Sequence, residues 1–68
     1  MESRALLRSV DPGSSASCVA CGKPIKFSAK NPQRQVIANV YVEGRWDRVE
    51  QFHSPCYDEQ GHPFGEPR

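Results

Sequence analysis

Cys18-Val19-Ala20-Cys21-Gly22 and His53-Ser54-Pro55-Cys56 are the two stretches of sequence that decide the fold. Each stretch contains two potential metal ligands separated by two residues, and 31 residues lie between Cys21 and His53. Three thiolates and one imidazole in two close pairs suit a tetrahedral Zn²⁺ ion. The glycine directly after Cys21 can adopt the left-handed conformation that a turn around a metal requires. The pattern predicts one Zn²⁺ per chain, with four ligands: Cys18, Cys21, His53 and Cys56.

The chain is small, and its size explains why a metal is needed. It has 68 residues, 37% of them hydrophobic, and only sixteen large apolar side chains remain once alanine, cysteine and Met1 are set aside. A core of this size contributes about 3–5 kcal/mol at most, so such domains usually depend on a metal or on disulfides. Three cysteines are an odd number, and disulfides are rare in the cytoplasm. We therefore expect a single domain that a metal stabilises.

No stretch of the sequence has the length of a membrane-spanning helix. The longest apolar run has three or four residues, whereas about 20 are needed to cross a bilayer. Ala5-Leu6-Leu7 is too short for the apolar region of a signal peptide. The prediction is a cytoplasmic protein with no membrane partner.

The interval between the two ligand pairs contains a β-hairpin signal. Gln35–Val42 is rich in β-branched and aromatic residues, Glu43-Gly44 is a turn dipeptide, and Arg45–Phe52 is a second, less regular strand. The hairpin carries the chain out and back, so that ligands far apart in the sequence can converge.

The register of this hairpin depends on its turn. A two-residue turn places Tyr41 opposite Trp46 and Ala38 opposite Val49, whereas a three-residue loop with a bulge at Gly44 shifts the pairing by one and exchanges the faces. We interpret Tyr41 and Trp46 as a cross-strand hydrophobic pair on a small core. A platform on which nucleic-acid bases stack is the alternative.

The second ligand pair lies where a short helix is expected to begin. Ser54 is a good N-cap, Pro55 is favoured at the first helical position, Gly61 suits the end, and Pro63 prevents continuation. The predicted helix spans Pro55 to Gln60, with the last ligand in its first turn.

These elements predict a small α+β metal-stapled domain with a zinc knuckle, a β-hairpin and a short C-terminal helix, a treble-clef-like arrangement. We expect residues 1–17 to form a flexible N-terminal segment, residues 18–60 the zinc-binding domain, and residues 61–68 a coil tail. If the first segment is ordered, Leu6, Leu7 and Val10 dock on a partner or on the hairpin.

The ligand pattern resembles the zinc finger of poly(ADP-ribose) polymerases and of one DNA ligase, in which Cys-x2-Cys is followed by His-x2-Cys after a slightly shorter insert. The resemblance covers residues 18 to 57 and implies the same four ligands and binding to DNA ends and breaks. A complete LIM domain is excluded, because Tyr57-Asp58-Glu59 follows the fourth ligand where further cysteine pairs would be needed. The whole chain looks similar to small zinc-finger proteins of actinobacteria, a resemblance that supplies no function.

Charge is unevenly distributed along the chain. Residues 18–42 hold four cations and no acid, whereas residues 43–68 hold three cations and six acids. The four cations lie in the basic segment, defined here as residues 22–35: Lys23, Lys26, Lys30 and Arg34. Such a segment with an interleaved Phe27 suits contacts to the phosphates and bases of nucleic acid. In the alternative interpretation it is a connecting loop whose Ile25 and Phe27 pack under the knuckle.

The sequence predicts a binding module and no enzyme. Four good ligands leave no open position for a catalytic water, and no free acid–base pair remains once the ligands are assigned. DNA or RNA is the first candidate partner. The alternative is an adapter that docks on a larger protein complex through the hairpin and the N-terminal Leu6-Leu7 segment. We expect no small-molecule substrate.

Two alternatives to a zinc site with His53 as its histidine ligand are less favoured. His62 could replace His53 as a ligand, although its position after the helix is more typical of an exposed tail residue. An iron–sulfur cluster could use three cysteines and one histidine, but the long insert and Gly22 favour zinc.

Overall fold

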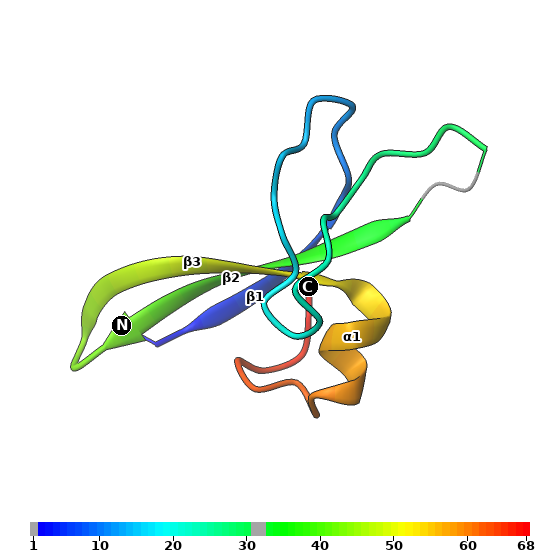
Figure 1. Ribbon diagram of the computed structural model, residues 1–68. Coiled ribbons are helices and arrows are strands. Elements are labelled where there is room, and N and C mark those ends of the chain that lie inside the picture. Colours follow the sequence, from blue (N-terminus) through cyan, green and yellow to red (C-terminus); the bar gives the residue numbers. More distant parts are fainter. Residues whose placement is uncertain (1, 31–32) are drawn as a thin grey trace.

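The computed structural model of the chain describes residues 2–30 and 33–68. Its elements in chain order are β1 (Arg4–Ser9), β2 (Arg34–Val42), β3 (Arg45–His53) and α1 (Ser54–Glu59). The strands form one antiparallel sheet in the order β1-β2-β3, and α1 with the C-terminal tail lies on one side of it (Figure 1). In these described residues, no helix has the length and apolar character needed to span a membrane.

The β2–β3 hairpin confirms the predicted two-residue turn. Val42 pairs with Arg45, and Tyr41 pairs with Trp46. Glu43 and Gly44 both have positive φ, +53° and +78°, as the turn that matches the twist of a hairpin requires.

The predicted pairing of Ala38 with Val49 is wrong. A β-bulge between Val40 and Tyr41 shifts the register, so that Ala38 lies opposite Glu50 and Val49 lies opposite Asn39. The extra residue in β3 breaks the alternation that the turn alone dictates.

The interpretation of Trp46 as a core residue is also wrong. Val36, Ala38 and Val40 are buried on one face of β2, and alternation places Tyr41 on the opposite face. Trp46, paired with Tyr41, is 56% exposed. The aromatic pair is therefore on the surface and outside the core.

The N-terminal segment contains a strand, which differs from the expected flexible segment over residues 1–17. Arg4–Ser9 pairs antiparallel with Arg34–Asn39 of β2. Ala5 and Val10 are buried, at 3% and 6% exposed. Burial of these apolar side chains on a preformed hairpin explains why a segment that forms no stable structure alone is ordered here. Met1 lies outside the described residues.

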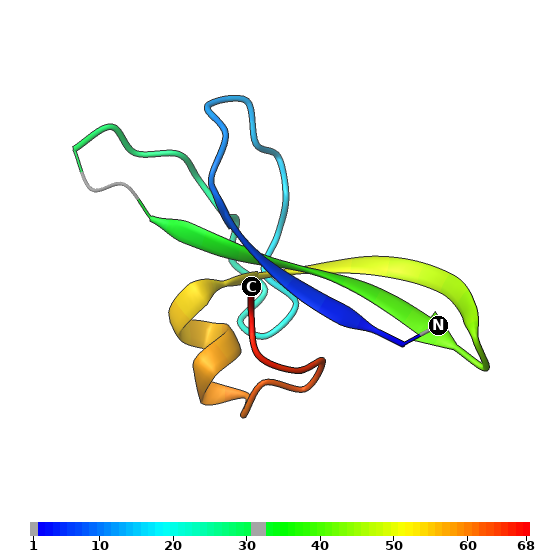
Figure 2. The same cartoon turned by 180° about the vertical axis from the view of Figure 1, so that it is seen from behind.

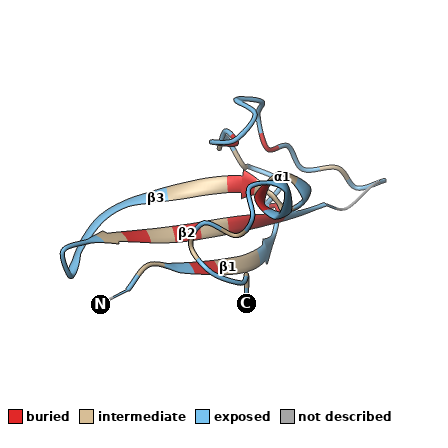
Figure 3. Cartoon of the chain, turned by 90° about the horizontal axis from the view of Figure 1, so that it is seen from below, coloured by how far each residue is buried: buried red, intermediate tan, exposed pale blue. Residues whose placement is uncertain are grey.

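The core lies between one face of the sheet and α1 with the C-terminal tail (Figure 3). Val36 and Phe52 of the sheet are buried together with Tyr57 of α1, and the rings of Phe52 and Tyr57 are 5.0 Å apart between centroids. Cys18 and Ile25, each 1% exposed, belong to the same cluster. The loop that carries the first ligand pair is thus part of the core.

The short helix begins one residue earlier than predicted. His53 occupies the N-cap position and makes no side-chain cap hydrogen bond, so Ser54 is the first helical residue rather than the cap. The helix also ends one residue earlier than predicted, at Glu59, with Gln60 as its C-cap. The predicted position of Gly61 after the cap is confirmed, because Gly61 has φ +79° and its N–H donates to the Asp58 carbonyl.

The tail after α1 lacks regular secondary structure, as predicted, but it is docked on the domain. The Leu7 N–H donates to the Arg68 carbonyl (2.6 Å), and the Arg68 N–H donates to the Ala5 carbonyl (3.1 Å), so the tail pairs with the outer edge of β1. The buried Tyr57 hydroxyl donates to the Gly65 carbonyl (2.6 Å) and accepts from the Phe64 N–H (3.0 Å).

Replacing Tyr57 by phenylalanine is expected to destabilise the domain by about 1–3 kcal/mol, because the change leaves the Gly65 carbonyl and the Phe64 N–H without their partner. Urea unfolding of the metal-loaded protein measures the difference. Tyr41→Phe is the matched control, since among the described residues no partner of the Tyr41 hydroxyl is found, and its effect is expected below about 0.5 kcal/mol. Equal stability of the two variants would show that the hydroxyl does not hold the tail.

Candidate metal centre

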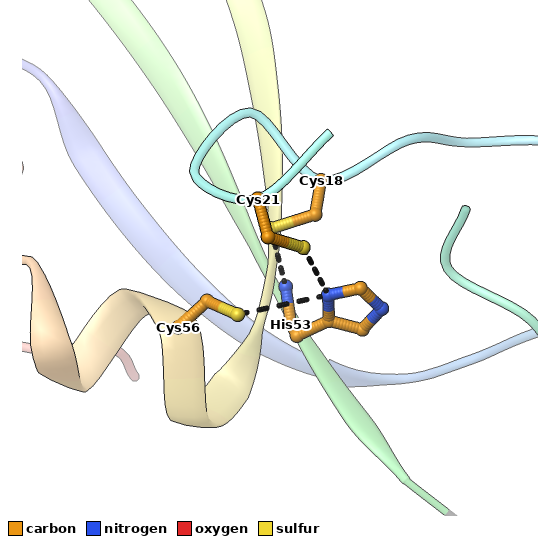
Figure 4. A group of neighbouring side chains, drawn as sticks. All are labelled: Cys18, Cys21, His53 and Cys56. Carbon is orange, nitrogen blue, oxygen red and sulfur yellow. Dashed lines mark hydrogen bonds between the residues drawn. The ribbon is translucent and has the colours of Figure 1, made fainter. Parts of the chain in front are cut away.

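Four side chains from three parts of the chain converge at one end of the sheet (Figure 4). Cys18 and Cys21 lie in the loop between β1 and β2, His53 ends β3, and Cys56 lies in the first turn of α1. One sulfur or ring nitrogen from each lies within 4.8 Å of all the others. The structure thus brings together the four residues that the sequence predicted, in a Cys3His cluster that could hold a metal ion.

Backbone hydrogen bonds hold the loop of the first pair against β3. The Gly22 N–H donates to the Cys18 carbonyl (2.8 Å), and Gly22 has φ +75°, the left-handed conformation expected for it. Ser17 and Pro24 form an isolated antiparallel bridge that closes the loop. The Val19 N–H donates to the Gln51 carbonyl (2.9 Å), which attaches the loop to β3 two residues before His53.

The His53 ring is oriented by a backbone carbonyl. Its Nε2 lies 3.2 Å from the Pro24 carbonyl oxygen, which can only accept, so Nε2 carries the proton and Nδ1 is left as the free lone pair. Nδ1 lies 3.4 Å from the Cys21 sulfur and 3.8 Å from the Cys56 sulfur. Metal–ligand bonds of about 2.0–2.3 Å in a tetrahedron give ligand–ligand distances of about 3.5–3.8 Å. The two distances from Nδ1 are therefore close to those of ligands that share a tetrahedral ion, and all four ligand atoms lie within 4.8 Å of one another.

The electrostatic environment differs among the cysteines. Burial opposes ionisation of Cys18, but hydrogen bonds from the backbone N–H groups of His53, Cys21 and Ala20 outweigh it and lower the pKa of Cys18 to about 6. Burial and the neighbouring Cys21 and Cys18 side chains raise the pKa of Cys56 to about 11. A cation bound among the sulfurs would offset the electrostatic repulsion between neighbouring thiolates and would favour their deprotonated form.

The cluster is buried on one side and open on the other. Cys18 is 1% exposed, whereas Cys21 is exposed and His53 and Cys56 are half-buried. A cleft of about 590 Å³ lies beside it and is lined by Gln33, Arg34, His53, Ser54, Pro55 and Cys56. Of the four predicted nucleic-acid contacts, only Arg34 lies in this cleft.

His62 does not belong to the cluster. Its Nε2 lies 2.8 Å from the Asp58 carboxylate, and its ring stacks on Tyr57 with centroids 5.4 Å apart. His62 therefore contacts Asp58 and Tyr57, and His53 is the histidine that faces the cysteine sulfurs.

The other predicted site residues are spread along the basic segment. Lys23, Lys26, Lys30 and Arg34 are all exposed, and within residues 2–30 and 33–68 none forms an ion pair. Ile25 packs in the core as the connecting-loop interpretation expects, but Phe27 is 46% exposed. Asn31 and Pro32 of this segment lie outside the described residues.

Sequence reasoning missed the backbone groups that orient the ligands. The Pro24 carbonyl contacts the His53 ring, and the Gln51 carbonyl accepts from the Val19 N–H. Every residue has a backbone carbonyl, so residue type does not reveal these two contacts. The only hint was position, since Pro24 lies three residues after Cys21 and Gln51 two residues before His53.

No protein-family model, curated protein or solved structure matches the chain. The resemblance to the polymerase finger therefore rests on the order and spacing of the four ligand residues.

The purified protein is expected to bind one metal ion per chain, and Cys56→Ser and His53→Ala should each lower the metal affinity by more than about 100-fold. Changes in residues that only support a ligand already cost about 10–100-fold, so loss of a ligand costs more. A competition titration against a coloured chelator measures the affinity. His62→Ala is the control and should bind as tightly as the unchanged protein; a Cys56→Ser protein that does the same would refute the assignment.

Proposed function

We propose that the chain is a structural-zinc module, treble-clef-like in arrangement, that binds nucleic acid through its basic segment. The donor set supports Zn²⁺, because three thiolates and one imidazole close to one another are its preferred ligands. Four protein ligands complete the coordination and leave no position for a reacting water, which supports a structural rather than a catalytic ion. A cytoplasmic location agrees with three free cysteines.

The observation that carries the nucleic-acid proposal is the set of unpaired cations described above. Ion pairs in the described parts of the chain use Arg48 and His62, which lie outside residues 18–42. The cations of the basic segment are therefore available to phosphates, and no acid within residues 18–42 competes for them. Arg34 adds a link to the metal centre, since it lines the cleft beside His53 and Cys56.

In the adapter alternative, the Leu6-Leu7 segment and the hairpin contact a partner protein. Leu7 lies in β1 and packs against the core, so it is less available for such a contact, whereas Leu6 lies opposite Ile37 on the other face. The alternative then depends on Leu6 and the exposed hairpin.

Removal of Zn²⁺ by a chelator is expected to unfold the domain, because Cys18 belongs to the same buried cluster as Val36 and Phe52. Structural zinc contributes about 10–16 kcal/mol in small peptides, far more than a core of this size. Amide dispersion in a two-dimensional NMR spectrum should collapse on chelation and return when zinc is restored. A metal-free protein with an unchanged spectrum would contradict a structural role.

A triple variant with Lys23, Lys26 and Lys30 replaced by glutamine should bind nucleic acid more weakly and with a shallower dependence on salt. Each lost phosphate contact reduces the slope of log K against log salt by about 0.7 for single strands and about 0.9 for duplex DNA, so a decrease of about 2–3 is expected. Fluorescence anisotropy with labelled oligonucleotides measures it. Arg45→Gln, an exposed cation outside the segment, is the control and should leave the slope unchanged. Equal affinity and slope for the triple variant would refute the proposal.

A further inference from the structure

An aromatic and apolar surface lies on the face of the sheet opposite α1, near the hairpin turn. Trp46 is 56% exposed and Val49 is 46% exposed, and both lie on the face that Tyr41 shares. The half of β3 nearest the turn is exposed throughout (Figure 3). Among the described residues, α1 and the tail pack on the other face, so they leave this surface uncovered.

Two arginines lie on the same face. Arg4 pairs with Asn39 and Arg8 pairs with Gln35, and both partners share the Tyr41 face by alternation along β2. Arg4 and Arg8 are exposed, and no ion pair of either is found in the described residues. Arg4 thus adds positive charge near the aromatic pair, because Asn39 lies two residues from Tyr41 on β2, whereas Arg8 lies farther along the same face, opposite Gln35.

The acidic side chains of the strands point the other way. Glu50 lies opposite the buried Ala38, and Arg48 lies opposite the buried Val40. Arg48 forms ion pairs with both Glu50 and the adjacent Asp47. Among the paired residues of the strands, the Trp46 face therefore carries cations and aromatic rings, and the carboxylate of Glu50 lies on the other face. At the end of the Trp46 face away from the turn, Asp11 lines a depression with Gln35 and Ile37.

We propose that this face binds single-stranded nucleic acid, with bases stacked on Trp46 and Tyr41 and phosphates paired with Arg4 and Arg8. Aromatic rings beside cations are the recurring elements of single-strand binding, because every base offers a π-face once it is unpaired. Bases in a duplex are already stacked on one another and cannot reach the indole. The inference rests on the proposed nucleic-acid binding and specifies the form of nucleic acid.

The basic segment and this face lie at opposite ends of the sheet. The hairpin turn is at one end and the loop of the basic segment at the other in both views (Figure 2). Arg34 and Tyr41 are seven residues apart on β2, which corresponds to about 24 Å at 3.4 Å per residue. Seven is an odd number, so Arg34 lies on the α1 face of β2, where it lines the cleft beside the Cys3His cluster, whereas Arg4 and Arg8 lie on the Tyr41 face. The two proposed contact regions are therefore separate.

Trp46 is the only tryptophan, so its fluorescence reports this face without a label. The zinc-loaded full chain is titrated with a ten-nucleotide single strand and with a duplex of the same length. Saturable quenching of Trp46 by the single strand, and none by the duplex, is expected. Emission that changes with protein concentration alone would show that a second copy covers this face, and would overturn the proposal.

Variants separate this proposal from the proposed function. In anisotropy titrations with the labelled single strand, Trp46→Ala should weaken binding about 10-fold, and Trp46→Phe should restore most of the affinity because phenylalanine also stacks. Val42→Ala is the control, since Val42 is an exposed apolar residue (50%) that directly follows Tyr41 on β2 and so lies on the opposite face, and it should have little effect. Zinc content verifies that each variant is folded.

If Trp46→Ala binds the single strand as tightly as the unchanged chain while the triple lysine variant binds weakly, the aromatic face is not the site and the basic segment is. If the unchanged chain binds neither single strand nor duplex, both proposals are wrong.

Discussion

The contact of His53 with the cysteine sulfurs joins three parts of the chain at one point. His53 ends β3, Cys56 begins α1, and Cys21 lies in the loop before β2. A change in any of these positions moves a ligand and the element that carries it. Because Cys18 and Ile25 of the ligand loop are also buried in the core, the metal centre and the hydrophobic cluster form one cooperative unit.

The features with local signals could be predicted from the sequence. The ligand spacing predicts the cluster, Glu43-Gly44 predicts the turn, and Gly61 predicts the end of the helix. Each depends on residues within a few positions of one another, where backbone conformation and ligand geometry decide the outcome. The same applies to Gly22, whose left-handed conformation follows from its place after Cys21.

The features that depend on contacts between distant residues could not be predicted from the sequence. β1 pairs with residues about thirty positions away, and nothing in Arg4–Ser9 shows that a hairpin edge is available to it. The bulge that places Glu50 opposite Ala38 has no glycine to mark it. The exposure of Trp46 follows from which face α1 covers, and that choice is made by Tyr57 and Phe52 at the far end of the hairpin.

The position of the Cys3His cluster is related to the exposure of the tryptophan. Tyr57 and Cys18 concentrate buried contacts at the end of the sheet next to the cluster, where a bound ion would add more stability than a small core can. The distal half of the hairpin is held mainly by its turn and its backbone ladder, so its side chains need not be buried. Large contiguous apolar patches on a protein surface often mark interaction sites. The buried contacts at one end of the sheet therefore leave Trp46 exposed at the other end.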